Sequence, residues 1–475
     1  MRQNFSPRRL SQLTTALSLL AMKIKLTPAT SAGIAPARQF PSLLRKSLAA
    51  GLLAAGMAAT AHGYVGDVFV IAMENTNWTQ VTNQFTGSQQ QIYQNPAAPY
   101  LNSLTNGTAA ISSQVSYASE YHNVLATLTG NGPSIHPSEP NYIWSEAGSN
   151  LGVLNDNQPY GTGGTNQNTT QHLTALLNTA GVTWKSYQEG IDMATTSGGV
   201  NTPGTNGLTN TVAAQSQWTV PLTNFSGTSA NYTNPYNGSH QYDYAAKHNP
   251  MVFFTDTNGG NNSTNTNTAR LNYSPLLQLQ TDLNNNTVSR YNWITPDQFN
   301  DMHTSLSGGF NYNGTLYTSG AAKIAQGDNF LSQIVPMIMA SSAYQNGGAI
   351  VLWWDESEPD GSGNQNDYNH TIPEIVISPL AHPNVGGLPF NDTDNLTHSD
   401  DLRSLQDLFG AYSQTGTPYL GDAQNAQGIN GLFATTAIPE PSTCAAWLGG
   451  VALAAAALAR RRAGAKRAVA VSAGV

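Results

Sequence analysis

The sequence predicts an α/β fold with a doubly wound, mostly parallel sheet and helices on both of its faces. Two apolar, β-rich runs, Asp67–Met73 and Gly348–Trp354, are typical of strands buried on both sides. Between them, His172–Thr179 has the leucine spacing of a helix, Gly181 ends it, and Val182–Tyr187 is typical of a strand. Helix–glycine–strand units that alternate with buried strands indicate a parallel sheet.

The other elements are expected at intervals along the body of the chain. Strands are predicted at Tyr291–Thr295 and Ile372–Ser378, and helices at Pro99–Leu104, Leu276–Leu283, Phe330–Met339 (kinked by Pro336) and Leu396–Gly410. Residues 194–240 and 258–268 are rich in Asn, Gly, Thr and Ser and lack periodicity. We interpret both as long polar insertions, and the first as a surface excursion or lid.

Charge is distributed unevenly along the 475 residues. Thirteen of the 19 basic residues lie near the two ends, whereas 26 of the 27 acidic residues lie between Tyr64 and Ala437, which leaves that body with a net charge of −20. Such a body repels nucleic acid and anionic lipid unless a local site carries bound cations. The only cysteine, Cys444, lies outside it, so the body has neither disulfides nor thiol chemistry.

Residues 1–63 are predicted to be a leader that ends in a secretory signal peptide. Basic residues including Arg38, Arg45 and Lys46 precede the apolar run Ser47–Ala59, and Ala59-Thr60-Ala61 forms a small-residue cleavage site. The alternative is a buried N-terminal helix. The order of charge, apolar run and cleavage site favours a signal for export.

The C-terminal residues 438–475 have the composition of a sorting tail. Pro439-Glu440-Pro441 precedes the apolar run Ala445–Ala459, which is short for a membrane span, and Arg460–Arg462 follow. This tail resembles the PEP-CTERM sorting signal of Gram-negative bacteria. The resemblance implies transient membrane anchoring, cleavage by an exosortase-type enzyme, and a final location at the cell surface or outside the cell. A plain anchor that is never cut is the alternative.

A serine between two prolines is the strongest candidate for a catalytic residue. Pro137 and Pro140 restrict the backbone around Ser138, and a helix-compatible run follows through Tyr142. We expect Ser138 to be the N-cap of that helix, where backbone N–H groups and the helix dipole favour a phosphate and an ionising alkoxide. The alternative is an ordinary capped turn.

Carboxylates follow both buried strands. Glu74 and Asn75 come directly after the first, and Asp355 and Glu356 after the second, where ligand sites of open α/β sheets lie. Adjacent carboxylates repel each other unless a cation lies between them, and carboxylate and amide oxygens bind divalent cations. For Glu74 taken alone, the alternative is an ordinary solvent-exposed residue of a loop.

Histidines and one lysine complete the set of candidates. Asp301 and His303 are two residues apart, so in extended backbone they point the same way and suit zinc or a similar metal. His398 lies just before the last helix. His136, Lys247 and His248 are candidates for contacting a phosphate group, although each also fits an ordinary structural role.

Taken together, these motifs resemble one known family over roughly Val65–Tyr412. In chain order they are Met73-Glu74-Asn75, His136-Pro137-Ser138-Glu139-Pro140-Asn141-Tyr142, Asn300-Asp301-Met302-His303, Trp354-Asp355-Glu356 and His398. Their order resembles the phosphoesterase family of bacterial phospholipases C and microbial acid phosphatases, within the alkaline-phosphatase-like superfamily. The resemblance implies a metal-assisted phosphate ester hydrolase on a doubly wound sheet, with residues 64–437 as its catalytic domain. The serine motif looks more like the acid phosphatase branch.

The expected mechanism starts with attack of Ser138 on phosphorus and proceeds through a phosphoserine that water hydrolyses. One divalent metal ion is expected near Ser138, on Glu74, Asn75, Asp355 and Glu356. A second would use Asp301, His303 and His398. Zinc, calcium, magnesium and iron all remain open, as does the number of ions.

The remaining expected site residues act on the phosphate ester itself. His136 and His248 would stabilise phosphate oxygens or protonate the leaving group, and Asn141 and Lys247 would bind the substrate. Two alternatives to a monoesterase stay open. One is a phospholipase C or other phosphodiesterase with the same centre, and the other is a non-catalytic surface or matrix protein.

Overall fold

The computed structural model describes residues 64–79, 91–123, 136–195, 208–358 and 371–434. The chain divides into two units, Met1–Thr60 and Ala61–Val475, and every described residue belongs to the second. The predicted leader and sorting tail therefore lie outside the described residues. In the part of the chain that is described, none of the helices combines the length and the apolar composition needed to cross a bilayer.

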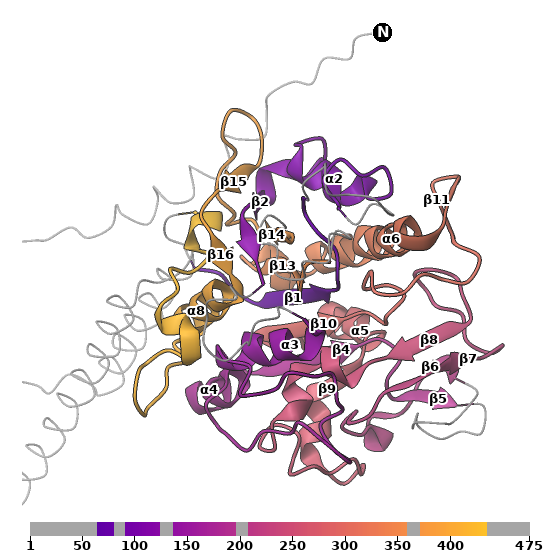
Figure 1. Ribbon diagram of the computed structural model, residues 1–475, viewed down its shortest axis with the longest axis vertical. Helices are drawn as coiled ribbons and strands as arrows, with labels where there is room; N and C mark the ends of the chain where they lie inside the picture. The colour runs from indigo at the N-terminus through magenta and orange to yellow at the C-terminus, as the bar shows by residue number, and fades with distance from the viewer. Residues whose placement is uncertain (1–63, 80–90, 124–135, 196–207, 359–370, 435–475) are drawn as a thin grey trace, which may run out of the picture. The chain divides into compact units, whose positions relative to one another are not determined.

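An eight-stranded sheet forms the centre of the second unit (Figure 1), in the order β15-β2-β14-β13-β1-β10-β4-β9. Five of its seven strand pairs are parallel, and β14 runs antiparallel to both of its neighbours. The strands are β1 Val68–Met73, β2 Val115–Ala118, β4 Trp184–Gln188, β9 Tyr273–Pro275, β10 Tyr291–Thr295, β13 Ala349–Trp354, β14 Glu374–Ile377 and β15 Phe390–Asp392. The predicted α/β class with a mostly parallel sheet is confirmed.

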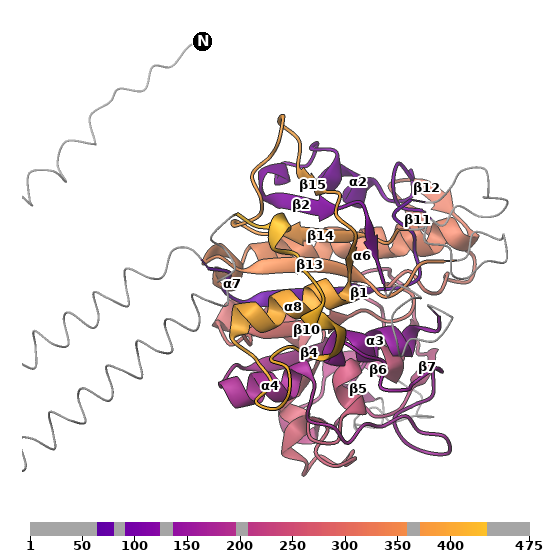
Figure 2. The same cartoon turned by 60° about the vertical axis from the view of Figure 1, so that its left-hand side comes forward.

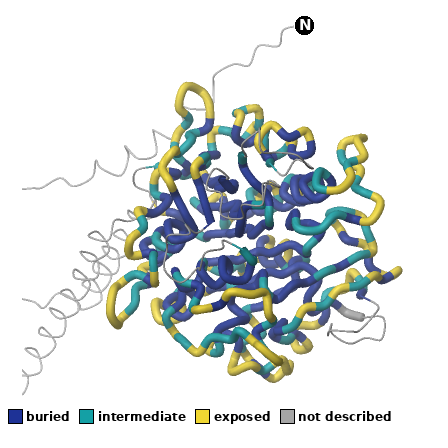
Figure 3. The backbone as a smooth tube through the Cα atoms, in the orientation of Figure 1, coloured by how far each residue is buried: buried dark blue, intermediate teal, exposed yellow. Residues whose placement is uncertain are grey.

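Helices cover both faces of this sheet, as Figures 1 and 2 show. On one face α3 (Ser138–Ala147), α4 (Leu173–Ala180) and α8 (His398–Phe409) pack against one another. On the other face α6 (Ser319–Met339) contacts α2 (Pro99–Thr105), α5 (Gln278–Asn285) and α7 (Ser342–Gln345). Every residue of β1 and β13 is buried between the two layers (Figure 3), which explains their continuous apolar sequence.

The pairing of β1 with β13 sets the register that matters for the site. The two strands are parallel, and Met73 pairs with Trp354 at their carboxyl ends. The next residues, Glu74 and Asp355, therefore leave the sheet side by side, and the Asp355 N–H donates to the Met73 carbonyl at 3.2 Å.

The ends of α8 are capped as the sequence predicts. Thr397 and Asp400 form a reciprocal capping box at its start, and Gly410 ends it in the left-handed conformation with φ of 61°.

By contrast, α6 begins eleven residues before the predicted Phe330, because small residues hide its periodicity. One of them, Gly327, allows a close approach, since a Cβ there would collide with the Met302 side chain.

The described part of residues 194–240 has more regular structure than the sequence predicts for a surface excursion or lid. Strand β5 (Met193–Thr195) pairs with β6 (Leu208–Val212), and β7 (Phe225–Thr228) pairs with β8 (Gln241–Tyr244). A small separate core of four buried side chains joins these hairpins, namely Met193, Leu208, Tyr232 and Tyr242. Its members meet only through long-range pairing, so no local periodicity reveals them. Residues 258–268 contain no regular strand or α-helix, as predicted.

Two further strand pairs lie outside the large sheet, one parallel and one antiparallel. Strand β3 (Tyr121–His122) pairs with β16 (Leu396–Thr397), and β11 (Phe310–Tyr312) pairs with β12 (Thr315–Tyr317). The first pair brings Tyr121 beneath α8, where it donates a hydrogen bond to Asp401. Glu374 of β14 lies beside Asp401, and both side chains are buried. Two neighbouring buried carboxyl groups repel each other when both are ionised, so burial favours the protonated form of at least one of them.

The buried pair predicts a fall in stability as pH rises. Burial and the charge of Asp401 raise the pKa of Glu374 well above its usual value, and burial, opposed by the Tyr121 hydrogen bond, raises the pKa of Asp401 to about 8. Because both pKa values are higher in the folded than in the unfolded chain, the stabilisation is complete at acid pH and is lost as pH rises toward about 8.

Urea unfolding of the wild type and Glu374→Gln between about pH 5 and pH 8 measures this effect. A permanent amide replaces one titratable carboxyl group, so the free energy of unfolding should fall less steeply in Glu374→Gln, by up to about 1.4 kcal/mol per pH unit. The exposed Asp394→Asn serves as the control variant. Equal slopes for the wild type and Glu374→Gln would show that Glu374 does not titrate with a raised pKa in the folded chain.

Candidate active site

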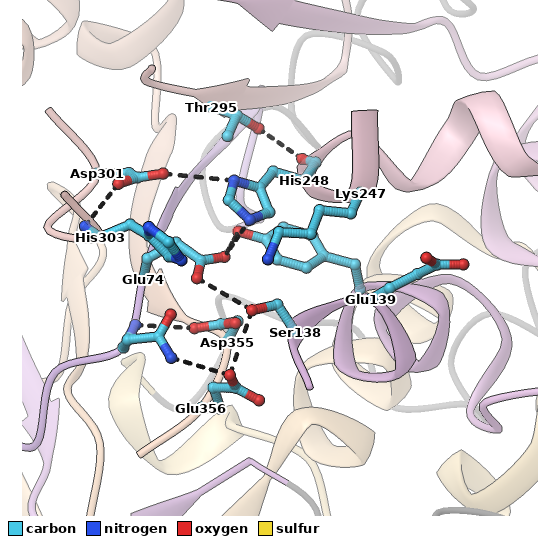
Figure 4. Close-up of polar contacts among 12 residues, drawn as sticks. Glu74, Ser138, Glu139, Lys247, His248, Thr295, Asp301, His303, Asp355 and Glu356 are labelled. Carbon is cyan, nitrogen blue, oxygen red and sulfur yellow. Dashed lines mark hydrogen bonds and ion pairs between the residues drawn. The ribbon is translucent and has the colours of Figure 1, made fainter. Parts of the chain in front are cut away.

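The centre of the site is built from the residues that follow β1 and β13. The Asn75 N–H donates to Asp355 Oδ1 at 3.1 Å, and Asn75 Nδ2 donates to Glu356 Oε1 at 2.9 Å. Glu74, Asp355 and Glu356 are buried. Figure 4 shows Glu74, Asp355 and Glu356 around the Ser138 hydroxyl. The structure thus brings the residues that follow the two strands together.

Ser138 approaches these carboxylates from the start of α3. It was expected to be the N-cap, but the extended Pro137 occupies that position and Ser138 is the first helical residue. Its hydroxyl therefore does not cap the helix, and lies 3.2 Å from both Glu74 Oε2 and Glu356 Oε1. A hydroxyl has one proton, so it donates to one of these oxygens at a time. The Glu139 N–H in the first turn donates instead to Asp156 Oδ1 at 3.0 Å.

Carboxyl groups outnumber the cationic groups around Ser138. Burial raises the pKa of Glu356, and burial together with the charges of Glu74 and Glu356 raises that of Asp355 well above its usual value. Burial also raises the pKa of Asp301 to about 7, against the effect of His248. For Glu74, burial acts in the same direction, but His248 and Lys247 outweigh it and hold its pKa well below the usual range.

His248 is the cation most tightly enclosed by these carboxylates. Its Nε2 lies 3.0 Å from Glu74 Oε1, and its Nδ1 lies 3.4 Å from Asp301 Oδ2. Thr295 Oγ1 donates to the His248 carbonyl at 2.9 Å, as Figure 4 shows. Burial lowers the pKa of His248, but the two carboxylates raise it to about 9. Since both ring nitrogens face carboxylates, His248 contributes positive charge to the centre.

The other three predicted residues on the substrate side are also near the carboxylates. His136 Nδ1 lies 2.8 Å from Glu356 Oε1, and Asn141 Nδ2 donates to Glu356 Oε2 at 3.0 Å. Lys247 forms an ion pair with Asp156 at 2.9 Å, and its side chain is 14% exposed. Burial lowers the pKa of His136, but its hydrogen bond to Glu356 gives a net increase.

The second group of predicted metal ligands does not come together as expected. Met302 has φ of 82°, so Asp301 and His303 lie in a turn rather than in extended backbone, and the His303 N–H donates to Asp301 Oδ1 at 2.8 Å. Burial lowers the pKa of His303 to about 4. His398 Nε2 instead lies 3.0 Å from the Trp354 carbonyl, and its ring packs on Trp353 at 4.5 Å between centroids.

The residues beside Ser138 fit a cation by their donor chemistry. Asn75 Oδ1 and Asp355 Oδ2 are buried oxygens without a hydrogen-bond partner in the described part of the chain. With Glu74 and Glu356 they form an all-oxygen set, which suits hard cations such as Mg²⁺ and Ca²⁺. Within the described ranges, no three His, Cys, Asp or Glu side chains already stand as a complete metal centre. The metal site therefore stays a prediction.

Two residues of the site were missed by the sequence analysis. Tyr142 donates to Glu74 Oε1 at 2.8 Å, and its spacing of four residues from Ser138 on a predicted helix was a usable signal. Asp156, which binds both the Glu139 N–H and Lys247, lies in a polar loop 18 residues after Ser138. No local pattern distinguishes that loop from the other polar loops.

Comparison with known proteins gives one family match over most of the chain. The model of the Phosphoesterase family matches residues 55–411. Among solved structures, a protein in the alkaline phosphatase superfamily from Vibrio parahaemolyticus is 10% identical and covers 74% of this chain and 68% of its own, with a TM-score of 0.35. The PsFucS1 sulfatase from Pseudoalteromonas sp. is 9% identical, with a TM-score of 0.39. That match covers 84% of this chain and 78% of the sulfatase chain.

Three curated relatives are phosphatases by name. A probable acid phosphatase of Kluyveromyces lactis is 24% identical over 242 residues, and an acid phosphatase of Aspergillus fumigatus is 25% identical over 222 residues. These matches span 50% and 46% of this chain but only 42% and 36% of the two relatives. A phosphatidylinositol-3-phosphatase of Mycobacterium tuberculosis is 23% identical over 394 residues, which are 81% of this chain and 91% of that protein.

Divalent cations should stabilise the folded chain through the carboxylates beside Ser138. Chelation should lower the thermal midpoint of the purified full chain, and readdition of Mg²⁺, Ca²⁺ or Zn²⁺ should restore it. At a hundredfold excess over Kd, the cation should add about 2.7 kcal/mol to the free energy of unfolding. Asp355→Asn should abolish this shift, whereas the exposed Asp394→Asn should retain it. A shift that Asp355→Asn preserves would place the cation elsewhere.

Proposed function

Because the chain belongs to the Phosphoesterase family, we propose that it is a phosphoric ester hydrolase that cleaves phosphate monoesters in the manner of an acid phosphatase. The observation that carries this proposal is the position of the Ser138 hydroxyl. It lies at the start of a helix and 3.2 Å from each of two buried carboxylates. A helix N-terminus favours an anionic phosphate, and a neighbouring carboxylate can accept the hydroxyl proton.

Ser138 is the proposed nucleophile. As its Oγ forms a bond to phosphorus, the Oγ proton passes to Glu74 or Glu356, and the bond from phosphorus to the ester oxygen breaks. Water then attacks the phosphoserine, and Ser138 recovers its proton as inorganic phosphate leaves. A divalent cation held by Glu74, Asn75, Asp355 and Glu356 would act as a Lewis acid that lowers the pKa of the Ser138 hydroxyl.

Two histidines supply positive charge for the phosphate and a proton for the leaving alcohol. His248 is enclosed by Glu74 and Asp301, so it offsets the charge of the centre. His136 is 16% exposed and binds Glu356 through Nδ1. We assign it the protonation of the leaving oxygen. Its raised pKa keeps it protonated at acid pH, which supports an acid optimum.

We do not assign Asp301 and His303 to a second metal site, although the sequence suggested one. Their proposed role is to position His248. Asp301 holds the His248 imidazole through Oδ2, and its Oδ1 accepts the His303 N–H. Asp301 therefore fixes the orientation of His248 by direct contact. His398, packed on Trp353 and bonded to the Trp354 carbonyl, supports the end of β13 from which Asp355 and Glu356 extend.

Replacement of the nucleophile tests this function. Ser138→Ala should lower kcat for p-nitrophenyl phosphate by at least about a thousandfold with the fold intact, since the covalent route is removed. The matched control is Ser145→Ala. Ser145 lies on the same helix, and its hydroxyl donates to the Tyr142 carbonyl at 2.7 Å.

The same assay separates the alternative functions. Turnover of bis-p-nitrophenyl phosphate or phosphatidylcholine in place of the monoester would favour the diesterase. Wild-type turnover in Ser138→Ala would eliminate the proposed nucleophile. No turnover of any of these esters, with cations resupplied, would favour the non-catalytic surface protein.

We also propose that the protein is exported and that its tail is removed. The basic and apolar runs before Tyr64 and the Pro-Glu-Pro tail after Ile438 support this proposal. Intact mass spectrometry of protein from the cell surface and medium should find an N-terminus near residue 62 and a C-terminus close to the Pro-Glu-Pro motif. A secreted chain that still reaches Val475 would contradict exosortase-type cleavage.

A further inference from the structure

We propose that Tyr142 is a positioning residue that fixes the Glu74 carboxylate so that only one of its oxygens faces the nucleophile. This inference rests on the proposed function of Ser138. Tyr142 is fully buried and lies four residues after Ser138 in α3. Residues four apart lie on the same face of a helix, so one helical turn presents both hydroxyl groups to Glu74.

The two oxygens of Glu74 have separate partners. The Tyr142 hydroxyl donates to Oε1 at 2.8 Å, and His248 Nε2 lies 3.0 Å from the same oxygen. Ser138 Oγ lies 3.2 Å from Oε2. With a hydrogen bond from Tyr142 and an ion pair with His248 on Oε1, rotation of the carboxylate would break both of these contacts. Oε2 is thereby held toward Ser138.

The Tyr142 ring is itself held firmly on three sides. It stacks on the His248 imidazole with ring centroids 5.1 Å apart and planes 18° apart. The rings of Trp293 and Trp353 meet it edge-on at 6.0 Å and 5.3 Å. These contacts involve the ring and do not depend on the hydroxyl. Tyr142→Phe should therefore keep the packing and remove only the hydrogen bond to Glu74.

Loss of that hydrogen bond should slow chemistry more than substrate binding. Hydrogen-bond partners of metal-ligating side chains typically contribute about 10- to 100-fold to metal affinity or activity, and Glu74 is a proposed ligand. We expect Tyr142→Phe to lower kcat for p-nitrophenyl phosphate by about this factor while KM changes less than about threefold, because the lost hydroxyl contacts Glu74 and the ring contact with His248 is kept.

The matched control is Tyr187→Phe. Tyr187 is also fully buried, and its hydroxyl donates at 2.7 Å to Asp282 of α5, which contributes no residue to the site. Both variants lose one buried tyrosine hydroxyl, so a comparable change in thermal midpoint is expected. Only Tyr142→Phe should lower kcat. An equal loss of kcat in both variants would show a merely structural effect and overturn the assignment.

The outcomes separate this inference from the proposed function. If Ser138→Ala is inactive and Tyr142→Phe has wild-type kcat, the positioning role is overturned and the nucleophile stands. If Ser138→Ala keeps its activity, the proposed function fails first. A crystal structure of Tyr142→Phe gives a readout independent of turnover. Rotation of the Glu74 carboxylate away from its wild-type orientation supports the inference, and an unchanged carboxylate contradicts it.

Discussion

The parallel pairing of β1 with β13 is the constraint on which the site depends. Because Met73 pairs with Trp354, Glu74-Asn75 and Asp355-Glu356 leave the sheet at adjacent points. The same register buries three carboxyl groups close together, which is unfavourable unless positive charge enters the cluster. His248 and His136 each bind one of these carboxylates and supply part of that charge. The orphaned oxygens of Asn75 and Asp355 indicate where further positive charge would be stabilising.

Helix α3 completes the site from one face of the sheet. Its first turn supplies Ser138 and Asn141, and the next residue, Tyr142, contacts both Glu74 and His248. A single rigid helix thus places the nucleophile and the group that orients its neighbouring carboxylate. Segments from distant parts of the chain surround it, and Asp156 binds both the first turn of α3 and Lys247. Precise geometry at Ser138 therefore depends on contacts that span much of the second unit.

The sequence predicted those parts of the site that follow from local pattern. β1 and β13 are continuous apolar runs, and the polar residues after them were recognised because ligands lie beyond strand ends. Features that depend on the backbone conformation of the folded chain were not predicted from the sequence. The extended Pro137 takes the capping position from Ser138, and the positive φ of Met302 turns His303 away from the expected alignment with Asp301. The two strand pairs between Met193 and Tyr244 depend on contacts between segments separated by polar loops.

The central claim is that Ser138 carries the phosphoryl group during turnover. Rapid acid quenching of the full-length protein during hydrolysis of p-nitrophenyl phosphate, followed by peptide mass spectrometry, tests it most directly. Phosphate is expected on Ser138 in a peptide that includes the start of α3, formed at least as fast as steady-state turnover. Sustained turnover with phosphate on a different residue, or with none on the protein at any time point, would contradict it.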